Sequence, residues 1–219
     1  AHFGAERTYD FFFDNFGLNS YDGAGAIINS FVHYDNNYVN AFWDGTQMTY
    51  GDGDSFNYSP LTSIEIVGHE ITHAVTMHSA GLAYAYESGA LNESFSDIFG
   101  ATIRFLNTPS TATWYIGDQI VIAGGTGIPF RNMSDPNQFS CADTYGGRFW
   151  NYGDIVHFDS GVQNFWYYLL TTGGSGTNDI GNSYTVSGIG LDDAAAIAFR
   201  NLHVYLTPNS TFSDARFYA

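Results

Sequence analysis

The segment 61–81, LTSIEIVGHEITHAVTMHSAG, constrains the fold of this chain more than any other part of the sequence. Its apolar residues recur at helical spacing, at Ile64, Val67, Ile71 and Val75. Pro60 precedes the segment and Gly81 closes it, so we predict a helix between them. His69 and His73 are four residues apart, and a helix therefore places both imidazoles on one face.

The five residues His69-Glu70-Ile71-Thr72-His73 have the spacing of a zinc site. Two imidazoles on one helical face can reach one ion at about 2.0–2.1 Å. Glu70 stands one residue beyond the first histidine, where a base that activates a water molecule belongs. The alternative interpretation is a pair of ordinary surface histidines on an amphipathic helix. The pattern predicts one catalytic Zn²⁺ and a hydrolytic reaction.

A hydrolytic zinc site needs a third protein ligand and one open position. His78 lies about 180° round the helix from His69 and is expected to be a surface or packing residue. Glu93 and Asp97 are four apart in a second predicted helix, so they share one face. A carboxylate ligand at Glu93 would leave Asp97 to orient a ligating histidine. Glu87 remains a rival third ligand.

The order of the predicted elements indicates an α+β fold. Residues 1–81 form a strand-rich part that ends in the histidine helix, and residues 82–219 form a mainly helical part. The remaining predictions are a helix at 5–16, strands within 26–50, a helix from about 87 that stops before Pro109, an irregular stretch at 107–156, and helices at 160–170 and 191–206.

Charge and composition exclude several classes of protein. The net charge is −16, and the six basic residues are all arginine, so we expect no nucleic-acid partner and no membrane-surface role. No apolar run is long enough to span a membrane, and any signal peptide is expected to be already removed. Cys141 is the single cysteine and is expected to be a small loop residue rather than a catalytic thiol.

The chain resembles the thermolysin-like zinc metalloendopeptidases. The resemblance is carried by NNYVNAFWDGTQMTYGDGD, VGHEITHAVT, AGLAYAYESGALNESFSDIFG, RNMSDP and VHFDSGVQNFWYYL, which together extend over nearly the whole sequence. It implies a strand-rich and a helical lobe, with the zinc helix on the floor of a cleft between them. It also implies a secreted, extracellular enzyme that acts on polypeptide substrates. A removed propeptide, or remaining segments of the same precursor, are further implied partners.

The resemblance assigns a role to each candidate residue. It makes Glu93 the third zinc ligand, Asp97 the partner behind His69, and Asn92 a support for His73. It makes Tyr84 and His157 donors to the oxyanion of the tetrahedral intermediate. The implied substrate-binding residues are Asn40, Ala41, Arg131, Leu61, Ile66 and Phe130, of which the last three line an apolar pocket on the leaving-group side.

Without the resemblance, the same residues have plainer interpretations. Asn40 reads as a turn residue and Tyr84 as a core residue. Arg131 reads as a member of a structural ion pair, and His157 as a packed histidine. His2, His33 and His203 match no catalytic motif and are expected to be structural.

The chain also departs from the family pattern. It is shorter at both ends, from which we expect a processed product, a fragment or further parts in another chain. Arg104 stands where an acidic calcium ligand is expected, and a guanidinium is incompatible with a calcium cage. We therefore predict that Arg104 pairs with Glu65 or Asp118, and that calcium is not supported at the usual family site. The carboxylate behind His157 is left open, with Asp154 nearest in sequence.

Two rival functions remain. One is a catalytically inactive zinc-binding fragment of such a protease, and the other is an acidic, aromatic carbohydrate-binding module. The presence of both Glu70 and His157 argues against the first, because an inactive descendant often loses its base. The aromatic residues are spread at core-like spacing rather than gathered on one face, which argues against the second.

Overall fold

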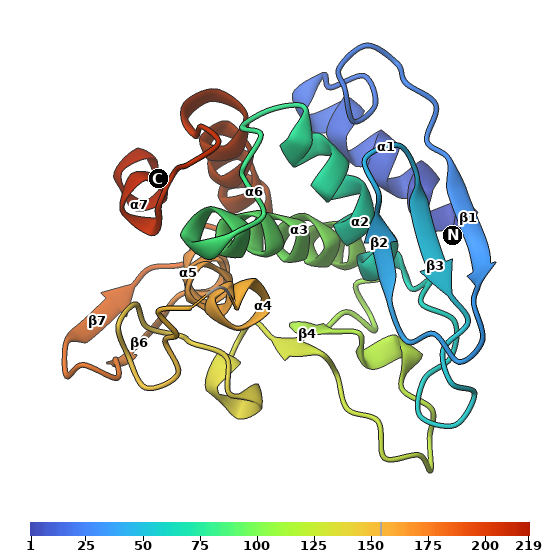
Figure 1. The fold of residues 1–219 in the computed structure, drawn as a ribbon. Coiled ribbons are helices and arrows are strands. Elements are labelled where there is room, and N and C mark those ends of the chain that lie inside the picture. The colour runs from blue at the N-terminus through green and yellow to red at the C-terminus, as the bar shows by residue number, and fades with distance from the viewer. Residues whose placement is uncertain (154) are drawn as a thin grey trace. The chain divides into compact units, whose positions relative to one another are not determined.

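The computed structural model describes residues 1–153 and 155–219 and confirms the α+β class (Figure 1). The described residues divide into two compact units. Unit 1 contains residues 1–78 and 99–130, and unit 2 contains residues 79–98 and 131–219. The predicted domain boundary between residues 81 and 82 stays a prediction, and so does the cleft that the resemblance implies. No helix among the described residues has the length and apolar character needed to cross a lipid bilayer.

Unit 1 begins with helix α1 (His2–Phe16), which packs against helix α2 (Ile64–Met77). The predicted start of α1 at residue 5 was three residues late. Phe11 and Phe12 are buried and meet the ring of Phe99 at 6.0 and 5.2 Å. Gly17 ends α1 in the left-handed conformation with φ of 68°, as its sequence position predicted.

The sheet of unit 1 has the strand order β1-β3-β2 (Figure 1). Strand β1 (Ser30–Tyr34) is parallel to β3 (Met48–Gly51), and β2 (Ala41–Trp43) is antiparallel to β3. The central strand β3 is buried along its whole length. Strand β2 is therefore an edge strand that follows directly after Asn40.

Helix α2 is buried on nearly all sides because it packs on the sheet and on the second half of helix α3 (Tyr86–Asn107). A Cβ atom at Gly100 would lie 2.4 Å from the carbonyl oxygen of Glu65 and 3.3 Å from the nitrogen of His69. A Cβ atom added at Gly68 would in turn lie 3.1 Å from the Cα atom of Gly100. These two glycines let the backbones of α2 and α3 approach closely. Helix α2 ends at Met77, one turn before the predicted stop at Gly81.

The remainder of unit 1 is an irregular excursion with little regular structure, as its composition predicted. It holds strand β4 (Tyr115–Ile116) and the 3₁₀ helix η1 (Asp118–Ile120).

Unit 2 is mainly helical. It contains the first part of α3, strand β5 (Arg131–Asn132), the 3₁₀ helix η2 (Pro136–Phe139), and helices α4 (Val156–Asp159) and α5 (Gly161–Thr172). The hairpin β6 (Gly174–Thr177) and β7 (Ser183–Val186) comes next. Helix α6 (Leu191–Arg200), the π-helical segment η3 (Asn201–Tyr205) and helix α7 (Phe212–Tyr218) complete it. The single helix predicted at 191–206 is thus an α-helix that widens into a π-helix.

Candidate metal centre

Helix α2 brings His69 and His73 together. Their Nε2 atoms lie 3.0 Å apart, and their rings meet almost at right angles with centroids 4.7 Å apart. Two nitrogens bound to one tetrahedral zinc ion would lie about 3.3 Å apart, given bonds of about 2.0–2.1 Å. His69 is buried and His73 is half-buried. The pair has the separation that a shared metal ion requires.

Glu70 follows His69 on the same helix and is buried. Its negative charge is close enough to act on Tyr50, the buried tyrosine of strand β3. Burial raises the pKa of Tyr50 well above its ordinary value, and the charge of Glu70 raises it further. Tyr50 is therefore a neutral phenol at every working pH and adds no second negative charge near Glu70.

Glu93 of α3 is buried and meets two other predicted site residues within unit 2. The hydroxyl of Tyr84 donates a hydrogen bond to its Oε1 atom. His157 on α4 places its Nε2 atom 3.4 Å from the same oxygen and 3.4 Å from the Tyr84 hydroxyl. The structure thus brings together three side chains that are up to 73 positions apart in sequence.

The same face of α3 carries a buried ion pair. Arg131 donates from Nε to Oδ2 of Asp97 at 2.6 Å and from Nη2 to Oδ1 at 2.6 Å. Its Nη2 atom also lies 3.9 Å from Oε2 of Glu93. Burial lowers the pKa of Arg131, but the carboxylates of Asp97 and Glu93 outweigh this effect and raise the pKa above its ordinary value, so the guanidinium is permanently charged. The structural interpretation of Arg131 as an ion-pair residue is confirmed, and its binding of substrate stays a prediction.

Asn164 completes this cluster and was missed in the sequence. Its Nδ2 donates to Oδ2 of Asp97 at 2.8 Å, and its Oδ1 accepts from the hydroxyl of Ser94 at 2.8 Å. The only signal in the sequence is a polar residue on the inward face of a predicted helix.

His69, His73 and Glu93 form a group of side chains in which each offers one ligand atom that could hold a metal ion. Two imidazoles and one carboxylate are a donor set that suits Zn²⁺ at a catalytic site. The rival ligand Glu87 is engaged elsewhere in unit 2. Its Oε1 accepts from the hydroxyl of Tyr145 at 2.8 Å, and its Oε2 accepts from the backbone nitrogen of Phe212 at 2.9 Å. These contacts give Glu87 a structural role.

Apart from Arg131, which belongs to unit 2, the predicted substrate-binding residues lie in two places in unit 1. Asn40 and Ala41 stand at the start of the edge strand β2, where the carbonyl of Asn40 accepts from the nitrogen of Gly51 at 3.0 Å. Leu61 and Ile66 are buried in one apolar cluster, and the half-buried Phe130 packs against it. The structure therefore groups the three residues of the predicted pocket, and their contact with substrate stays a prediction.

Two further assignments are not tested by these contacts. The amide of Asn92 donates to the carbonyl of Leu82 at 3.1 Å, and its support of His73 stays a prediction. Asp154, the nearest candidate for the carboxylate behind His157, lies outside the described residues.

The predicted ion pair of Arg104 is confirmed. Arg104 donates to both carboxylate oxygens of Asp118, at 2.5 and 3.2 Å, and lies 3.8 Å from Oε1 of Glu65. Burial raises the pKa of Glu65, while the charge of Arg104 opposes that rise. In the loop GDGDS at residues 51–55, the carboxylate of Asp54 accepts hydrogen bonds from the backbone nitrogens of residues 56–58, and these bonds lower its pKa to about 2. Asp54 thus shapes the loop.

Cys141 is buried and free of disulfides. Its burial raises the pKa of the thiol to about 11, so almost no reactive thiolate forms near neutral pH. Burial and a raised thiol pKa fit the predicted role of Cys141 as a small loop residue.

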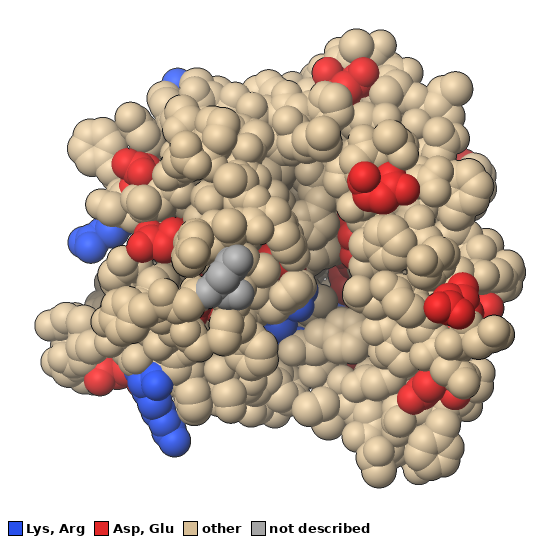
Figure 2. Space-filling view, in the orientation of Figure 1, with Lys and Arg blue, Asp and Glu red and all other residues tan. Residues whose placement is uncertain are grey.

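The molecular surface agrees with the strongly negative net charge. Figure 2 shows Asp and Glu side chains dispersed over the visible face, with few arginines among them. No basic patch suited to a phosphate backbone is visible on this face.

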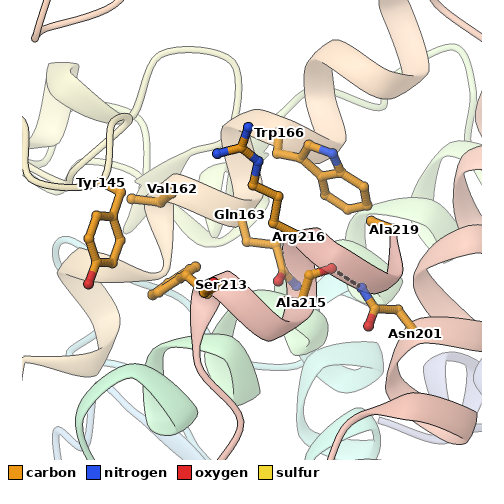
Figure 3. A pocket seen from close by; sticks show the side chains of 10 residues that line it. Tyr145, Val162, Gln163, Trp166, Asn201, Ser213, Ala215, Arg216 and Ala219 are labelled. Atoms are coloured by element: carbon orange, nitrogen blue, oxygen red, sulfur yellow. Dashed lines mark hydrogen bonds between the residues drawn. The ribbon is translucent and has the colours of Figure 1, made fainter.

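A cavity of about 410 Å³ lies in unit 2 (Figure 3), and Tyr145 and Phe212, the two partners of Glu87, are among its lining residues. Trp166, Gln163 and Arg216 line it, and the amide of Asn201 donates to the carbonyl of Ala215 at 2.8 Å beside it. None of its lining residues was predicted as a site residue, and none is a His, Cys, Asp or Glu that could bind zinc.

Comparisons with known proteins agree on one family. Residues 1–77 match the model of the thermolysin metallopeptidase catalytic domain, and residues 80–219 match that of the thermolysin metallopeptidase alpha-helical domain. The chain is 44% identical to bacillolysin of Bacillus cereus, 45% to bacillolysin of Brevibacillus brevis, and 44% to thermolysin of Alicyclobacillus acidocaldarius. Each match covers 99% of this chain but only 38%, 40% and 39% of the relative, so the chain spans about two fifths of their length.

A solved structure gives the same result. The precursor of protealysin, a metalloproteinase from Serratia proteamaculans, superposes with a TM-score of 0.80 at 31% identity. The match covers 99% of this chain and 69% of that one.

Proposed function

Because the chain belongs to the thermolysin metallopeptidase family, we propose that it is a zinc-dependent endopeptidase that cleaves peptide bonds with an activated water. The observation that carries the proposal is the pair His69 and His73 on one face of α2, with the buried Glu70 beside it. Glu93 supplies the carboxylate of the ligand set. The alternative is a catalytically inactive zinc-binding fragment of such a protease.

Each side chain near the ligands has a chemical task under this proposal. A bound zinc ion lowers the pKa of water to about 7 and polarises a carbonyl group. Glu70 accepts the proton of the attacking water and later delivers it to the leaving amine, which is general acid–base catalysis. Tyr84 and His157 donate hydrogen bonds to the negative oxygen that develops on the substrate carbonyl. The Tyr84 hydroxyl and the His157 Nε2 atom lie 3.4 Å apart, so both can approach one oxygen atom.

The substrate is bound as an extended chain. The edge strand β2 has one free side for a peptide strand to pair with, and Asn40 and Ala41 stand at its beginning. Arg131 binds the substrate carbonyl on the leaving-group side, where its charge is held in place by Asp97. Leu61, Ile66 and Phe130 favour an apolar side chain just after the scissile bond. We therefore propose cleavage on the amino side of apolar residues.

The family also supports the proposed setting of the enzyme. We propose secretion and an extracellular site of action, for which the acidic, lysine-free composition is suited. The similar protealysin structure is that of a precursor, which supports a propeptide or other precursor segments as partners of this chain.

The proposal is tested by replacing Glu70 with Gln. Glu70→Gln is expected to bind one zinc ion per chain and to lose about 10²–10⁴-fold or more of kcat, because only the general base is removed. Zinc content by atomic absorption and turnover of a furylacryloyl peptide measure the two effects. Glu6→Gln, on the exposed face of α1, is the matched control and should leave both values unchanged.

A chelator separates the enzyme from its rivals. The wild-type chain should cleave casein, lose this activity with 1,10-phenanthroline, and regain it when zinc is restored. Zinc binding without cleavage would identify the inactive fragment, and full turnover by Glu70→Gln would refute the mechanism.

A further inference from the structure

Asn164 of helix α5 is almost completely buried, with 1% of its surface exposed, and both ends of its amide are hydrogen-bonded to α3. Its Nδ2 donates to Oδ2 of Asp97, and its Oδ1 accepts from Ser94. The opposite amide orientation would set an oxygen against the Asp97 carboxylate, so Asp97 fixes the orientation that is seen. Asn164 thus joins two residues that are one helical turn apart on α3.

The Asp97 carboxylate receives three hydrogen bonds within this cluster. Two come from the planar fork of Arg131, and the third comes from Asn164. The third donor approaches Oδ2, the oxygen that also accepts from Arg131 Nε, and it opposes rotation of the carboxylate about its Cβ–Cγ bond. The orientation of Asp97 in turn sets the plane of the Arg131 guanidinium, because the bidentate pairing is directional.

The cluster ends at the proposed metal ligand. Arg131 Nη2 lies 3.9 Å from Oε2 of Glu93, the neighbour of Ser94 in sequence. Glu93, Asp97 and Arg131 are all buried, so small changes in their geometry act through a medium that screens charge poorly. If the guanidinium turned toward Glu93, its charge would compete with a zinc ion for the same carboxylate.

We propose that Asn164 is a positioning residue of the metal centre: it holds the Asp97–Arg131 pair and thereby keeps Glu93 available to zinc. The inference rests on the proposed function, since it assigns Glu93 to the metal. Asn164 acts through Asp97 and Arg131 and itself contacts neither the metal nor the substrate. Residues that orient metal ligands from behind typically change metal affinity or activity by about 10–100-fold when they are replaced.

The test compares Asn164→Ala with Asn201→Ala in the full chain. Asn201 is a matched control because it is equally buried, lies in the same unit and donates one hydrogen bond, to the carbonyl of Ala215, outside the cluster. Both substitutions should lower the melting temperature. Competition with a chelator for zinc ions should show about 10–100-fold weaker binding for Asn164→Ala and less than threefold change for Asn201→Ala.

A second variant keeps the inference testable if Asn164→Ala does not fold. Asn164→Asp retains the side-chain volume and the oxygen facing Ser94, but it replaces the donor to Asp97 with a like charge. Zinc affinity at neutral pH should fall at least tenfold. Wild-type zinc affinity in a folded Asn164→Ala or Asn164→Asp variant would overturn the inference while leaving the proposed function intact. A wild-type chain that binds no zinc would overturn both.

Discussion

Arg104 is an unusual residue to find inside a protein, and its replacement gives a sharp test of the ion pair. The side chain is 1% exposed and makes four hydrogen bonds, two to the carboxylate of Asp118 and one each to the carbonyls of Thr111 and Tyr115. Arg104→Met keeps an unbranched chain in the same space and removes all four hydrogen bonds and the positive charge.

The expected loss of unfolding free energy depends on which carboxylate left behind by Arg104 can still be hydrated. Asp118 is 22% exposed and can be hydrated, whereas Glu65 is fully buried, with Arg104 Nη1 3.8 Å from its Oε1 atom. Removing one member of a buried pair costs about 3–5 kcal/mol of unfolding free energy. In a chain of this size, 1 kcal/mol corresponds to about 2–4 °C, so the melting temperature should fall by about 6–20 °C.

The loss should also depend on pH. The pKa of buried Glu65 is already above its ordinary value, so the folded state binds this proton more tightly than the unfolded state. Its contribution to stability is present at low pH and is lost as pH rises through the folded-state pKa. Arg104→Met removes the opposing charge and raises that pKa further. The deficit in melting temperature should therefore be larger at pH 8 than at pH 5.

Thermal unfolding followed by circular dichroism measures these effects. A double variant, Glu65→Gln with Arg104→Met, supplies the control, because it removes the uncompensated charge as well. It should be more stable than Arg104→Met alone at pH 8. A melting temperature of Arg104→Met within about 2 °C of wild type would show that no buried charge is left uncompensated. A double variant that loses as much stability as the two single variants together would show the same.

Three further predictions concern calcium, the apolar pocket and the loop at residues 51–55. Selective removal of calcium with EGTA should shift the melting temperature only weakly, because Arg104 already neutralises the acidic site; a drop of tens of degrees with zinc retained would contradict this. Phe130→Leu should shift the cleavage profile toward Phe after the scissile bond, because the apolar pocket becomes deeper, whereas the wild type should prefer Leu or Val by a graded margin of about 1–3 kcal/mol. A wild-type profile dominated by Asp or Glu there would exclude the pocket. Asp54→Ala should lower the melting temperature at neutral pH, and the difference from wild type should shrink as pH falls from 3.8 to about 2, since the depressed pKa stabilises the fold only while the carboxylate is ionised. An undiminished difference at low pH would show that the charge is irrelevant to the loop.

The amino-acid sequence determined the features that depend on short-range geometry. The helical period of residues 61–81 placed His69 and His73 on one face, and the structure finds their Nε2 atoms 3.0 Å apart. The predicted pairing of Arg104 with Glu65 or Asp118 was also correct, and it rested on the resemblance, which places Arg104 at a site where carboxylates gather. The helix boundaries were predicted less accurately: α1 begins earlier and α2 ends earlier than predicted, since helix ends depend on tertiary contacts.

Only the tertiary structure decided which side chains from distant segments meet. The sequence left Glu87 and Glu93 as alternatives, and it is the contacts of Glu87 with Tyr145 and Phe212 that assign it elsewhere. The sequence showed Asn164 only as a polar residue on the inward face of a predicted helix, and its partner Asp97 lies 67 positions away. A helical period predicts which face of one segment is apolar, but it carries no information about which polar group another helix presents to that face. Packing of α5 on α3 supplied that choice, because a buried carboxylate is stable only where donors from other elements surround it.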